Sequence, residues 1–331
     1  MMRIQDCLLE SEKELAYKLV MSQGLSVDEK IDLTIGIFEE DDLIATGSIY
    51  ENVIKMIAID PNRQGENLTA TVLQALIDRL NERKITKYFL FTKPEYISVF
   101  QSLYFSLIIQ TDTIALFENA SYTIKERLID LKKSLKLERG TIASIVMNCN
   151  PVTKGHLYLI EKCANQQDNV IIFLVEENKS VFPFEIRMKL LKKATRHLRN
   201  VHILPSTPYI ISSATFPTYF LKEVGEASKI YMDLDIRIFK KYFMDIFDID
   251  FRYTGTEPLD PLTCQYNETM HSILKEQWIS IDRLSKDHHI VSASLVRRLA
   301  KDKKFLLLKP FVPGVTYRFL ISKKGRSLFK S

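Results

Sequence analysis

The most constraining feature of this 331-residue sequence is a series of short apolar runs in its second half. They are TIASIVM (141–147), NVIIFLV (169–175), NVHIL (200–204), KIYMDL (229–234) and DFRYTG (250–255), and a helical pattern separates each from the next. Strands that alternate with helices predict an α/β domain with a doubly wound, Rossmann-like parallel sheet. Ligands of such sheets bind at the carboxyl ends of strands, near the point where the strand order reverses.

The first half of the chain has a different pattern of apolar and polar residues, which is typical of an α+β unit that ends near residue 118. Alternating and β-branched residues predict antiparallel strands that meet at a turn at Asp41-Asp42. The expected elements are a helix over about 6–20, strands within 31–41 and 43–60, a helix over 67–83, a strand over 87–92 and a helix over 94–105. The charged helical stretch 120–140, which ends at Gly140, predicts a connector. We therefore expect two domains, 1–135 and 140–331.

The composition excludes several classes of protein. The formal net charge is only +5 and is spread along the chain, which indicates no nucleic-acid partner. The four cysteines are scattered without zinc-type spacing, so we expect reduced thiols and no metal ligated by the protein. We find neither a signal peptide nor an apolar run long enough to cross a membrane. A cytoplasmic protein without a membrane partner is the simplest expectation.

The turn after the first parallel strand, NCNPVTKGH (148–156), is rich in hydrogen-bonding groups. A strand that leads into a helix start offers free backbone N–H groups and the positive end of a helix dipole, which together favour an anion. Thr153 and His156 are three residues apart and can point to the same phosphate, while Gly155 permits close approach of a ligand or backbone. The same residues also fit a plain helix cap with an ordinary histidine, and this short pattern does not decide between them.

A second candidate phosphate site lies near the end of the chain, in HHIVSASLVRRLAKDKK (288–304). Ser292 suits a helix N-cap, and Arg297 falls on the same helix face as Ser294. Two hydroxyls and a guanidinium at a helix start can bind a β/γ-phosphate group. By itself, this segment also fits a capped surface helix with solvated arginines.

Together the two motifs resemble those of the T/HxGH nucleotidyltransferases, which adenylylate a substrate and release pyrophosphate. Thr153–His156 is similar to the first signature of that superfamily, and Ser292–Arg297 is similar to its ISSxxxR-like second signature. Between and beyond the motifs, SVFPFEIRMKLLKKAT, STPYIISSATFPTYFLK, GTEPLDPLTCQYNETMHSIL and FVPGVTYRFL resemble one family in particular, the [citrate (pro-3S)-lyase] ligases. This resemblance runs over essentially the whole chain.

The resemblance implies a specific reaction. Members of the family use ATP, with Mg²⁺, to activate acetate as acetyl-adenylate and release pyrophosphate. They then transfer the acetyl group to the prosthetic-group thiol on the acyl carrier subunit of citrate lyase and release AMP. That transfer converts inactive citrate lyase into its acetylated, working form.

The resemblance also implies roles for individual residues. His156, Thr153 and Lys154 would act at the α-phosphate, and Gly155, Ser292, Ser294 and Arg297 would complete the ATP site. Asn148 and Asn150 would contact phosphate or ribose, although they equally suit turn formation. The sequence itself offers further candidates. Ser212, Ser213 and Thr215 suit an acetate or thiol pocket or a helix cap, and Asp233 and Asp235, expected after a strand, suit a metal or nucleotide contact or a loop cap. Arg187 is expected on a solvated or carrier-binding helix face.

The first domain resembles acetyltransferases of the GNAT type but departs from them in one loop. Their Q/RxxGxG/A loop binds the pyrophosphate of coenzyme A through backbone N–H groups. Here Asn67 replaces the first glycine of that motif, so we do not expect binding of acetyl-CoA. The domain would either recognise the CoA-like prosthetic group of the lyase or only dock the carrier subunit, and we favour docking. Three other functions stay open: a GNAT-type acetyltransferase, a small-molecule adenylyltransferase and a nucleotide sensor.

Overall fold

The computed structural model describes residues 2–119, 122–176, 180–210, 224–256, 261–286 and 289–329. The chain divides into two compact units, Met1–Glu126 with Ile211–Asp235 and Arg127–Ile210 with Ile236–Ser331. Helices α4 (Ile124–Lys133) and α7 (Val224–Ile238) belong partly to each unit. The domain boundary expected at residues 135–140 stays a prediction.

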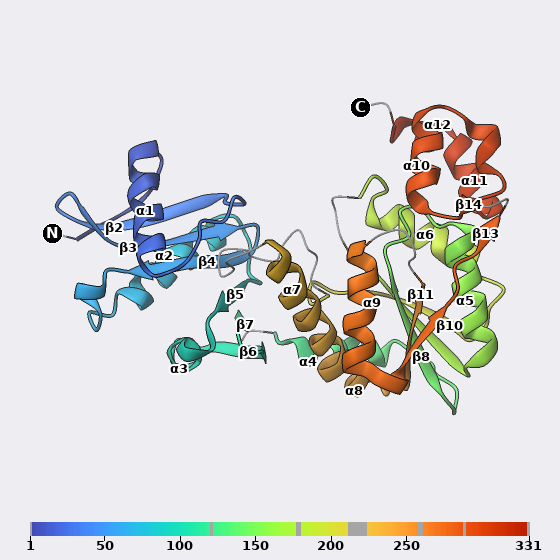
Figure 1. The fold of residues 1–331 in the computed structure, drawn as a ribbon, viewed down its shortest axis with the longest axis horizontal. Helices are drawn as coiled ribbons and strands as arrows, with labels where there is room; N and C mark the ends of the chain where they lie inside the picture. Colours follow the sequence, from blue (N-terminus) through green and yellow to red (C-terminus); the bar gives the residue numbers. More distant parts are fainter. Residues whose placement is uncertain are drawn as a thin grey trace. The chain divides into compact units, whose positions relative to one another are not determined.

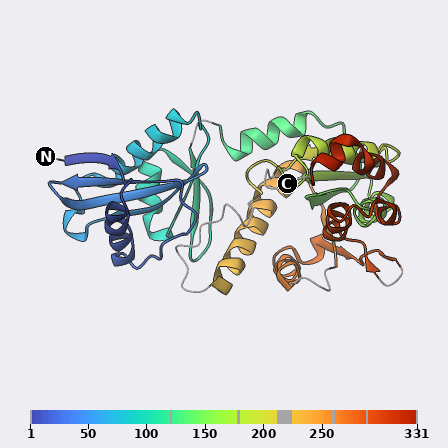
Figure 2. The same ribbon diagram turned by 90° about the horizontal axis from the view of Figure 1, so that it is seen from above.

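The first unit is built on a seven-stranded sheet in the order β1-β2-β3-β4-β5-β7-β6 (Figure 1, Figure 2). Its strands are β1 (Met2–Asp6), β2 (Leu33–Glu39), β3 (Asp42–Tyr50), β4 (Val53–Ile59), β5 (Phe89–Thr92), β6 (Phe105–Gln110) and β7 (Ala115–Asn119). Its helices are α1 (Glu10–Ser22), α2 (Leu68–Glu82) and α3 (Ile97–Ser102), with 3₁₀ turns at Pro61–Arg63 and Pro94–Tyr96. Neighbouring strands are antiparallel except β4 and β5. That parallel pair is joined only at Val53–Phe89 and Ile54–Leu90.

The spacing of apolar residues along α2 explains how this helix packs on the sheet to form the core of the first unit. The buried residues Leu68, Val72, Leu76 and Leu80 recur every four positions and form one apolar stripe against the sheet. The sequence did not indicate β1, β6 or β7, because each is short and none is bounded by clear turn residues. The expected helix over 6–20 starts later, at Glu10, since residues up to Asp6 pair with β2.

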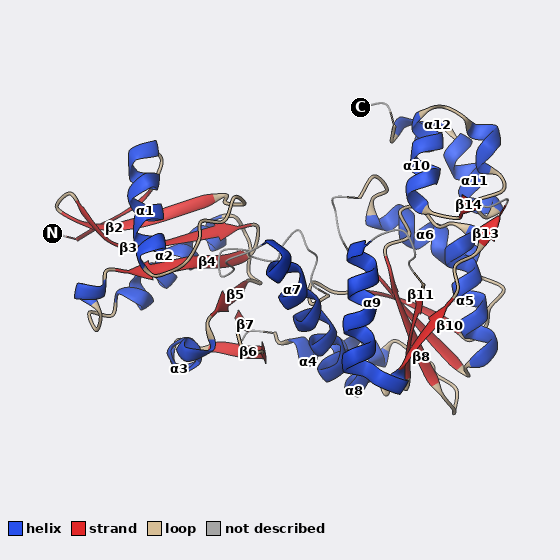
Figure 3. Cartoon of the chain, viewed as in Figure 1, coloured by secondary structure: helices blue, strands red, loops and turns tan. Residues whose placement is uncertain are grey.

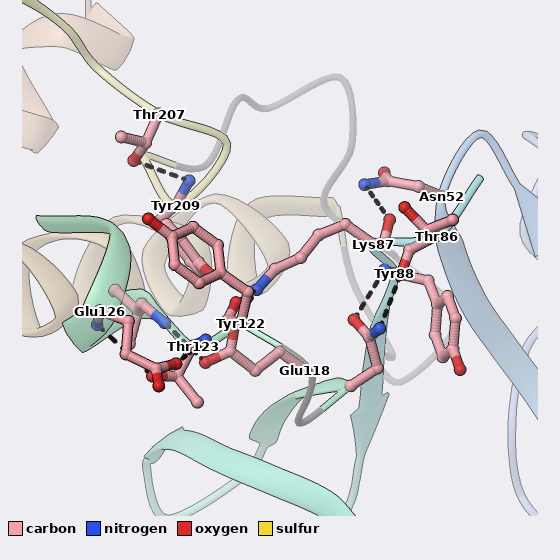
Figure 4. Close-up of polar contacts among 12 residues, drawn as sticks. Asn52, Thr86, Lys87, Tyr88, Glu118, Tyr122, Thr123, Glu126, Thr207 and Tyr209 are labelled. Carbon is pink, nitrogen blue, oxygen red and sulfur yellow. Dashed lines mark hydrogen bonds and ion pairs between the residues drawn. The ribbon is translucent and has the colours of Figure 1, made fainter. Parts of the chain in front are cut away.

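A buried carboxylate ties the start of α4 to this sheet (Figure 4). Glu118 of β7 accepts hydrogen bonds from Lys87 Nζ at 2.6 Å and from the backbone N–H of Ile124 at 2.8 Å. Lys87 Nζ also bonds to the carbonyl oxygen of Tyr122. The chain that leaves the sheet is therefore held by charge-assisted bonds before the helix begins.

The second unit contains a five-stranded parallel sheet in the order β10-β9-β8-β11-β12, seen between α9 and α5 in Figure 3. Its strands are β8 (Ile142–Met147), β9 (Asn169–Leu174), β10 (Val201–Pro205), β11 (Phe251–Gly255) and β12 (Trp278–Ile281), and a small hairpin pairs β13 (Ser285–Lys286) with β14 (His289–Ile290). Its larger helices are α5 (Lys154–Gln166), α6 (Phe184–Ala194), α9 (Pro261–Leu274), α10 (Ala293–Lys301) and α11 (Gly314–Ile321). Shorter elements are a π-helical turn at Phe239–Met244, α8 (Asp245–Phe247), α12 (Lys323–Ser327) and 3₁₀ turns at Lys275–Gln277 and Phe305–Leu308.

This strand order is that of a doubly wound sheet, so the predicted fold class is confirmed for the second unit. The order reverses between β8 and β11, which places the carboxyl ends of these strands at the expected ligand site. Strand β9 is buried along its whole length, as a central parallel strand should be. Helices α10, α11 and α12 form a group beside α6 (Figure 1), and α11 contacts α6 directly.

One predicted strand, 229–234, is wrong: these residues lie within helix α7. Apolar residues at every second position, among them Met232, Leu234 and Ile236, imitate a strand. The helix is buried over a wide face, and for such a helix periodicity does not distinguish the two structures. Asp233 and Asp235 therefore stand inside a helix and not at the end of a strand.

Candidate active site

The turn after β8 leads directly into the N-terminus of α5. The Asn150–Pro151 peptide bond in this turn is cis. Thr153 is the N-cap, and its hydroxyl oxygen accepts the backbone N–H of His156 at 3.3 Å. In return, the backbone N–H of Thr153 donates to Nδ1 of His156 at 3.0 Å. The helix start and the imidazole are thus positioned by the same reciprocal pair of bonds.

These contacts determine the protonation state of His156. A ring nitrogen that accepts an N–H bond carries no proton, so the hydrogen-bond network assigns the proton to Nε2. Burial, and then the nearby positive charge of Arg283, lower the pKa of His156 to about 4. The ring is therefore neutral at physiological pH and offers one N–H donor, at Nε2, to a ligand.

Gly155 permits the second motif to approach the first. A Cβ atom at this position would lie 2.9 Å from the carbonyl oxygen of Val291, a backbone atom. Val291 immediately precedes Ser292, the N-cap of α10. A glycine is therefore required where the start of α5 packs against the chain that enters α10.

The second motif forms the predicted cap and is bonded to the first motif. The hydroxyl oxygen of Ser292 accepts the backbone N–H of Leu295 at 3.2 Å. Arg297 donates to the carbonyl oxygen of Asn150 at 2.6 Å and to Ser294 Oγ at 3.1 Å. Partial burial lowers the pKa of Arg297 from its ordinary value. The guanidinium of Arg297 thus links residues that are 147 positions apart in the sequence.

A cavity of about 690 Å³ opens where the two helices begin. Its walls include residues of both motifs, namely Thr153, Gly155, His156, Ser292 and Ser294. Two further cations, Arg283 and Arg298, line it together with the carboxylate of Asp282. Two helix N-termini, several hydroxyls and two guanidinium groups suit a polyanionic ligand such as a chain of phosphates.

The two asparagines of the turn hold a neighbouring loop. Oδ1 of Asn150 accepts the backbone N–H of Phe182 at 3.0 Å. Asn148 exchanges hydrogen bonds with Ser180, and its Oδ1 accepts from Arg187 Nη1 at 2.8 Å. In the described parts of the chain, neither amide is among the residues that line the cavity. These contacts support the structural alternative for both residues.

The expectation of a solvated or carrier-binding Arg187 is wrong. Its side chain is fully buried, and its guanidinium donates to the carbonyl oxygens of Asn148, Val175 and Phe182 at 2.7–2.9 Å. Helical spacing alone could not show this, because the acceptors lie outside the helix, in the turn after β8 and in the loop between β9 and α6. Arg187 therefore fastens the turn after β8 to the loop after β9.

The other predicted site residues contribute less to the described cavity. Lys154 donates its backbone N–H to the carbonyl oxygen of Phe311 at 2.8 Å, and it is not among the cavity residues. Ser212, Ser213 and Thr215 lie outside the described residues. In the described ranges, no group of three or more His, Cys, Asp or Glu residues could hold a metal ion.

Comparison with known proteins gives a consistent result for most of the chain. The family described as "Citrate lyase ligase C-terminal domain" matches residues 142–320. The [citrate [pro-3S]-lyase] ligase of Escherichia coli is 37% identical over 305 residues, which cover 89% of this chain and 86% of the relative. The enzyme of the same name from Haemophilus influenzae is 32% identical over a region that covers 96% of this chain and 97% of the relative. This chain belongs to the citrate lyase ligase family.

More distant similarities concern parts of the chain. A phosphopantetheine adenylyltransferase of Streptococcus agalactiae is 29% identical over 120 residues, covering 34% of this chain and 73% of the relative. The crystal structure of Escherichia coli ElaA matches 36% of this chain and 99% of its own, with 14% identity and a TM-score of 0.32. The matched family region 142–320 contains both sequence motifs and every residue that lines the cavity.

Two cavity residues of this family member, Arg283 and Arg298, were missed by the sequence reasoning. Arg283 follows β12, a short strand that the sequence did not predict. The sequence feature that could have indicated this strand is the largely apolar run Trp278–Ile281, which is followed by the charged pair Asp282-Arg283. Trp278 itself donates its indole N–H to Thr254 Oγ1 at 2.9 Å and thereby supports the β11–β12 pair. Arg298 adjoins the predicted Arg297 and points to the cavity instead.

Proposed function

We propose that this chain activates acetate with ATP and transfers the acetyl group to the prosthetic-group thiol of the citrate lyase acyl carrier subunit. The observation that carries the proposal is the convergence of two capped helix starts, α5 and α10, on one cavity with two arginines. Membership in the citrate lyase ligase family supports the choice of acceptor. Transfer of the acetyl group would activate the lyase.

In the first step, a carboxylate oxygen of acetate attacks the α-phosphorus of ATP, and the bond to the leaving pyrophosphate breaks. In the second step, the thiol attacks the acetyl carbonyl, loses its proton, and AMP leaves. The protein mainly holds the reactants in line and stabilises the charge that develops on phosphoryl oxygens. No covalent enzyme intermediate is needed.

The residues present suit these tasks. The Nε2–H of neutral His156 would donate to an oxygen of the α-phosphate, with Thr153 holding the ring and Lys154 as a nearby cation. Ser292 and Ser294 would bind the β/γ end. The contact of Arg297 with phosphate stays a prediction, since its described bonds go to Asn150 and Ser294. Magnesium would enter with ATP as part of the substrate.

We propose that the first unit docks the carrier subunit. Asn67 adopts the left-handed conformation (φ 59°) that glycine favours, but unlike glycine it carries a side chain. Arg63 in this loop is already paired with Glu39 and Glu66 at 2.5 and 2.7 Å. The cavity beside the loop is lined by three carboxylates and two cations, a balance that does not favour a pyrophosphate.

The decisive experiment measures pyrophosphate release from ATP and Mg²⁺, with and without acetate and thiol-form citrate lyase. We expect release that requires acetate, increases with the lyase and falls about 10²–10³-fold in His156→Ala. Release that does not depend on acetate would refute the proposal. Loss of release without loss of ATP binding would assign His156 to the chemical step.

A second function is favoured by one observation, the similarity to phosphopantetheine adenylyltransferases over 120 residues. A small-molecule adenylyltransferase would use the same phosphate site with a phosphorylated acceptor. Replacing acetate by 4′-phosphopantetheine in the same assay distinguishes the two, because only this alternative yields pyrophosphate without acetate.

A further inference from the structure

Arg283 is held at the carboxyl ends of β11 and β12 by contacts on both sides. Its backbone N–H donates to Thr256 Oγ1 at 3.2 Å, directly after β11. Its Cγ and Nε atoms would lie 3.6 and 3.9 Å from a Cβ atom at Gly255, so the stem of the side chain runs across this glycine. The residue is half-buried and lines the cavity. The backbone and the side-chain stem of Arg283 are therefore positioned at the carboxyl ends of the two strands.

The electrostatic surroundings of Arg283 favour an anionic ligand. It is close enough to His156 for its charge to disfavour protonation of the imidazole. Arg298 and the N-termini of α5 and α10 bring further positive potential to the same cavity. Among the described residues, Asp282 is the one acidic side chain in the cavity wall. An excess of positive groups in the wall of one cavity favours binding of an anion there.

We infer that Arg283 binds the phosphate chain of the nucleotide from the end of β12, as a third phosphate-binding element beside the two helix starts. A guanidinium suits this place because its planar fork can donate two parallel bonds to one phosphate, whereas a lysine offers a point charge. The inference rests on the proposed function only in taking ATP as the substrate. It requires neither acetate nor the carrier subunit.

The test is calorimetric titration of the full chain with ATP, inorganic pyrophosphate and adenosine. We compare the wild type with Arg283→Gln, Arg283→Lys and Arg196→Gln, a control at an exposed arginine outside the cavity. We expect Arg283→Gln to weaken ATP and pyrophosphate about tenfold or more, and Arg283→Lys to weaken them less. Adenosine should bind all variants within about twofold, and Arg196→Gln should match the wild type.

The outcomes separate this inference from the proposed function. The inference would be overturned if Arg283→Gln bound ATP and pyrophosphate as tightly as the wild type does. It would also be overturned if a folded Arg283→Gln lost as much affinity for adenosine as for ATP. If Arg283→Gln does not fold, the affinities of Arg283→Lys for pyrophosphate and adenosine, each compared with the wild type, test the inference instead. The two proposals can also fail separately. If Arg283→Gln selectively loses affinity for ATP and pyrophosphate while the wild type releases no pyrophosphate with acetate, the role of Arg283 is supported and the ligase reaction is refuted.

Discussion

Replacing Gly155 by alanine tests whether close contact between the two motifs is needed for activity. The added Cβ would lie 2.9 Å from the carbonyl oxygen of Val291, whereas ordinary van der Waals contacts of a Cβ atom lie at 3.4–4 Å. The obstructing atom belongs to the backbone, so the segment before Ser292 must move by roughly half an ångström or more. The first turn of α10 would then move away from α5.

The expected effect is larger on activity than on stability. Overpacking costs ~1–3 kcal/mol, and the better helix propensity of alanine returns up to ~1 kcal/mol, so the free energy of unfolding should fall by ~0–3 kcal/mol. A misplacement of about 1 Å can cost about 10²-fold in rate, and we therefore expect Gly155→Ala to lose about tenfold or more in kcat/KM. Pyrophosphate release and urea unfolding measure the two effects.

Gly314→Ala is the matched control. Gly314 also lies in the first turn of a helix, but its added Cβ would meet only Arg318 Nη1, the end of a flexible side chain, at 3.5 Å. We expect unchanged activity and equal or slightly higher stability. A Gly155→Ala enzyme with kcat/KM within twofold of the wild type would show that the contact between the motifs does not control the reaction.

Three further predictions follow from the same contacts. Because the folded-state pKa of His156, about 4, lies below the ordinary 6.5, its stabilising contribution is present above pH 6.5 and is lost as pH falls towards 4. Urea unfolding at several pH values should show this loss in the wild type and a smaller one in His156→Gln. Arg283→Gln should raise the pKa of His156, measured by NMR titration of the ring, whereas an unchanged pKa would place Arg283 too far away. Arg187→Met should lower the free energy of unfolding by about 3 kcal/mol or more, since three buried carbonyl oxygens lose their donor; a loss below about 1 kcal/mol in thermal or urea unfolding would contradict this.

The sequence predicted those parts of the fold that depend on local pattern. Strands β8, β9, β10 and β11 are apolar runs bounded by helical patterns, and the structure confirms them. Ser292 was predictable as an N-cap because its role requires only its own helix. Strand β12, which begins at Trp278, was missed because its four residues are too few to show a clear periodicity, and only the charged pair that follows marks its end.

What the sequence could not predict depends on contacts between distant segments. The burial of Arg187 requires acceptors from the turn after β8 and the loop after β9, and nothing on its own helix indicates them. Asp233 and Asp235 were misplaced because a helix buried over a wide face has the same alternation of apolar residues as a strand. In each case tertiary burial, and not local propensity, decided the outcome.

The different contacts of Arg297 and Arg298 show, at the site itself, that contacts between distant segments cannot be predicted from local sequence. Arg297 and Arg298 are adjacent, so a helix directs their side chains about 100° apart, and only tertiary structure decides which one meets the ligand. Arg297 is engaged by the carbonyl oxygen of Asn150 and by Ser294, while Arg298 lines the cavity. A motif match therefore identifies the helix that carries the two arginines, while the tertiary structure places Arg298, and not Arg297, in the cavity wall. If the contact of Gly155 with Val291 positions α10, and if Arg298 binds phosphate, variants at 155 and 298 should be non-additive in kcat/KM, because both would then act on the same contact.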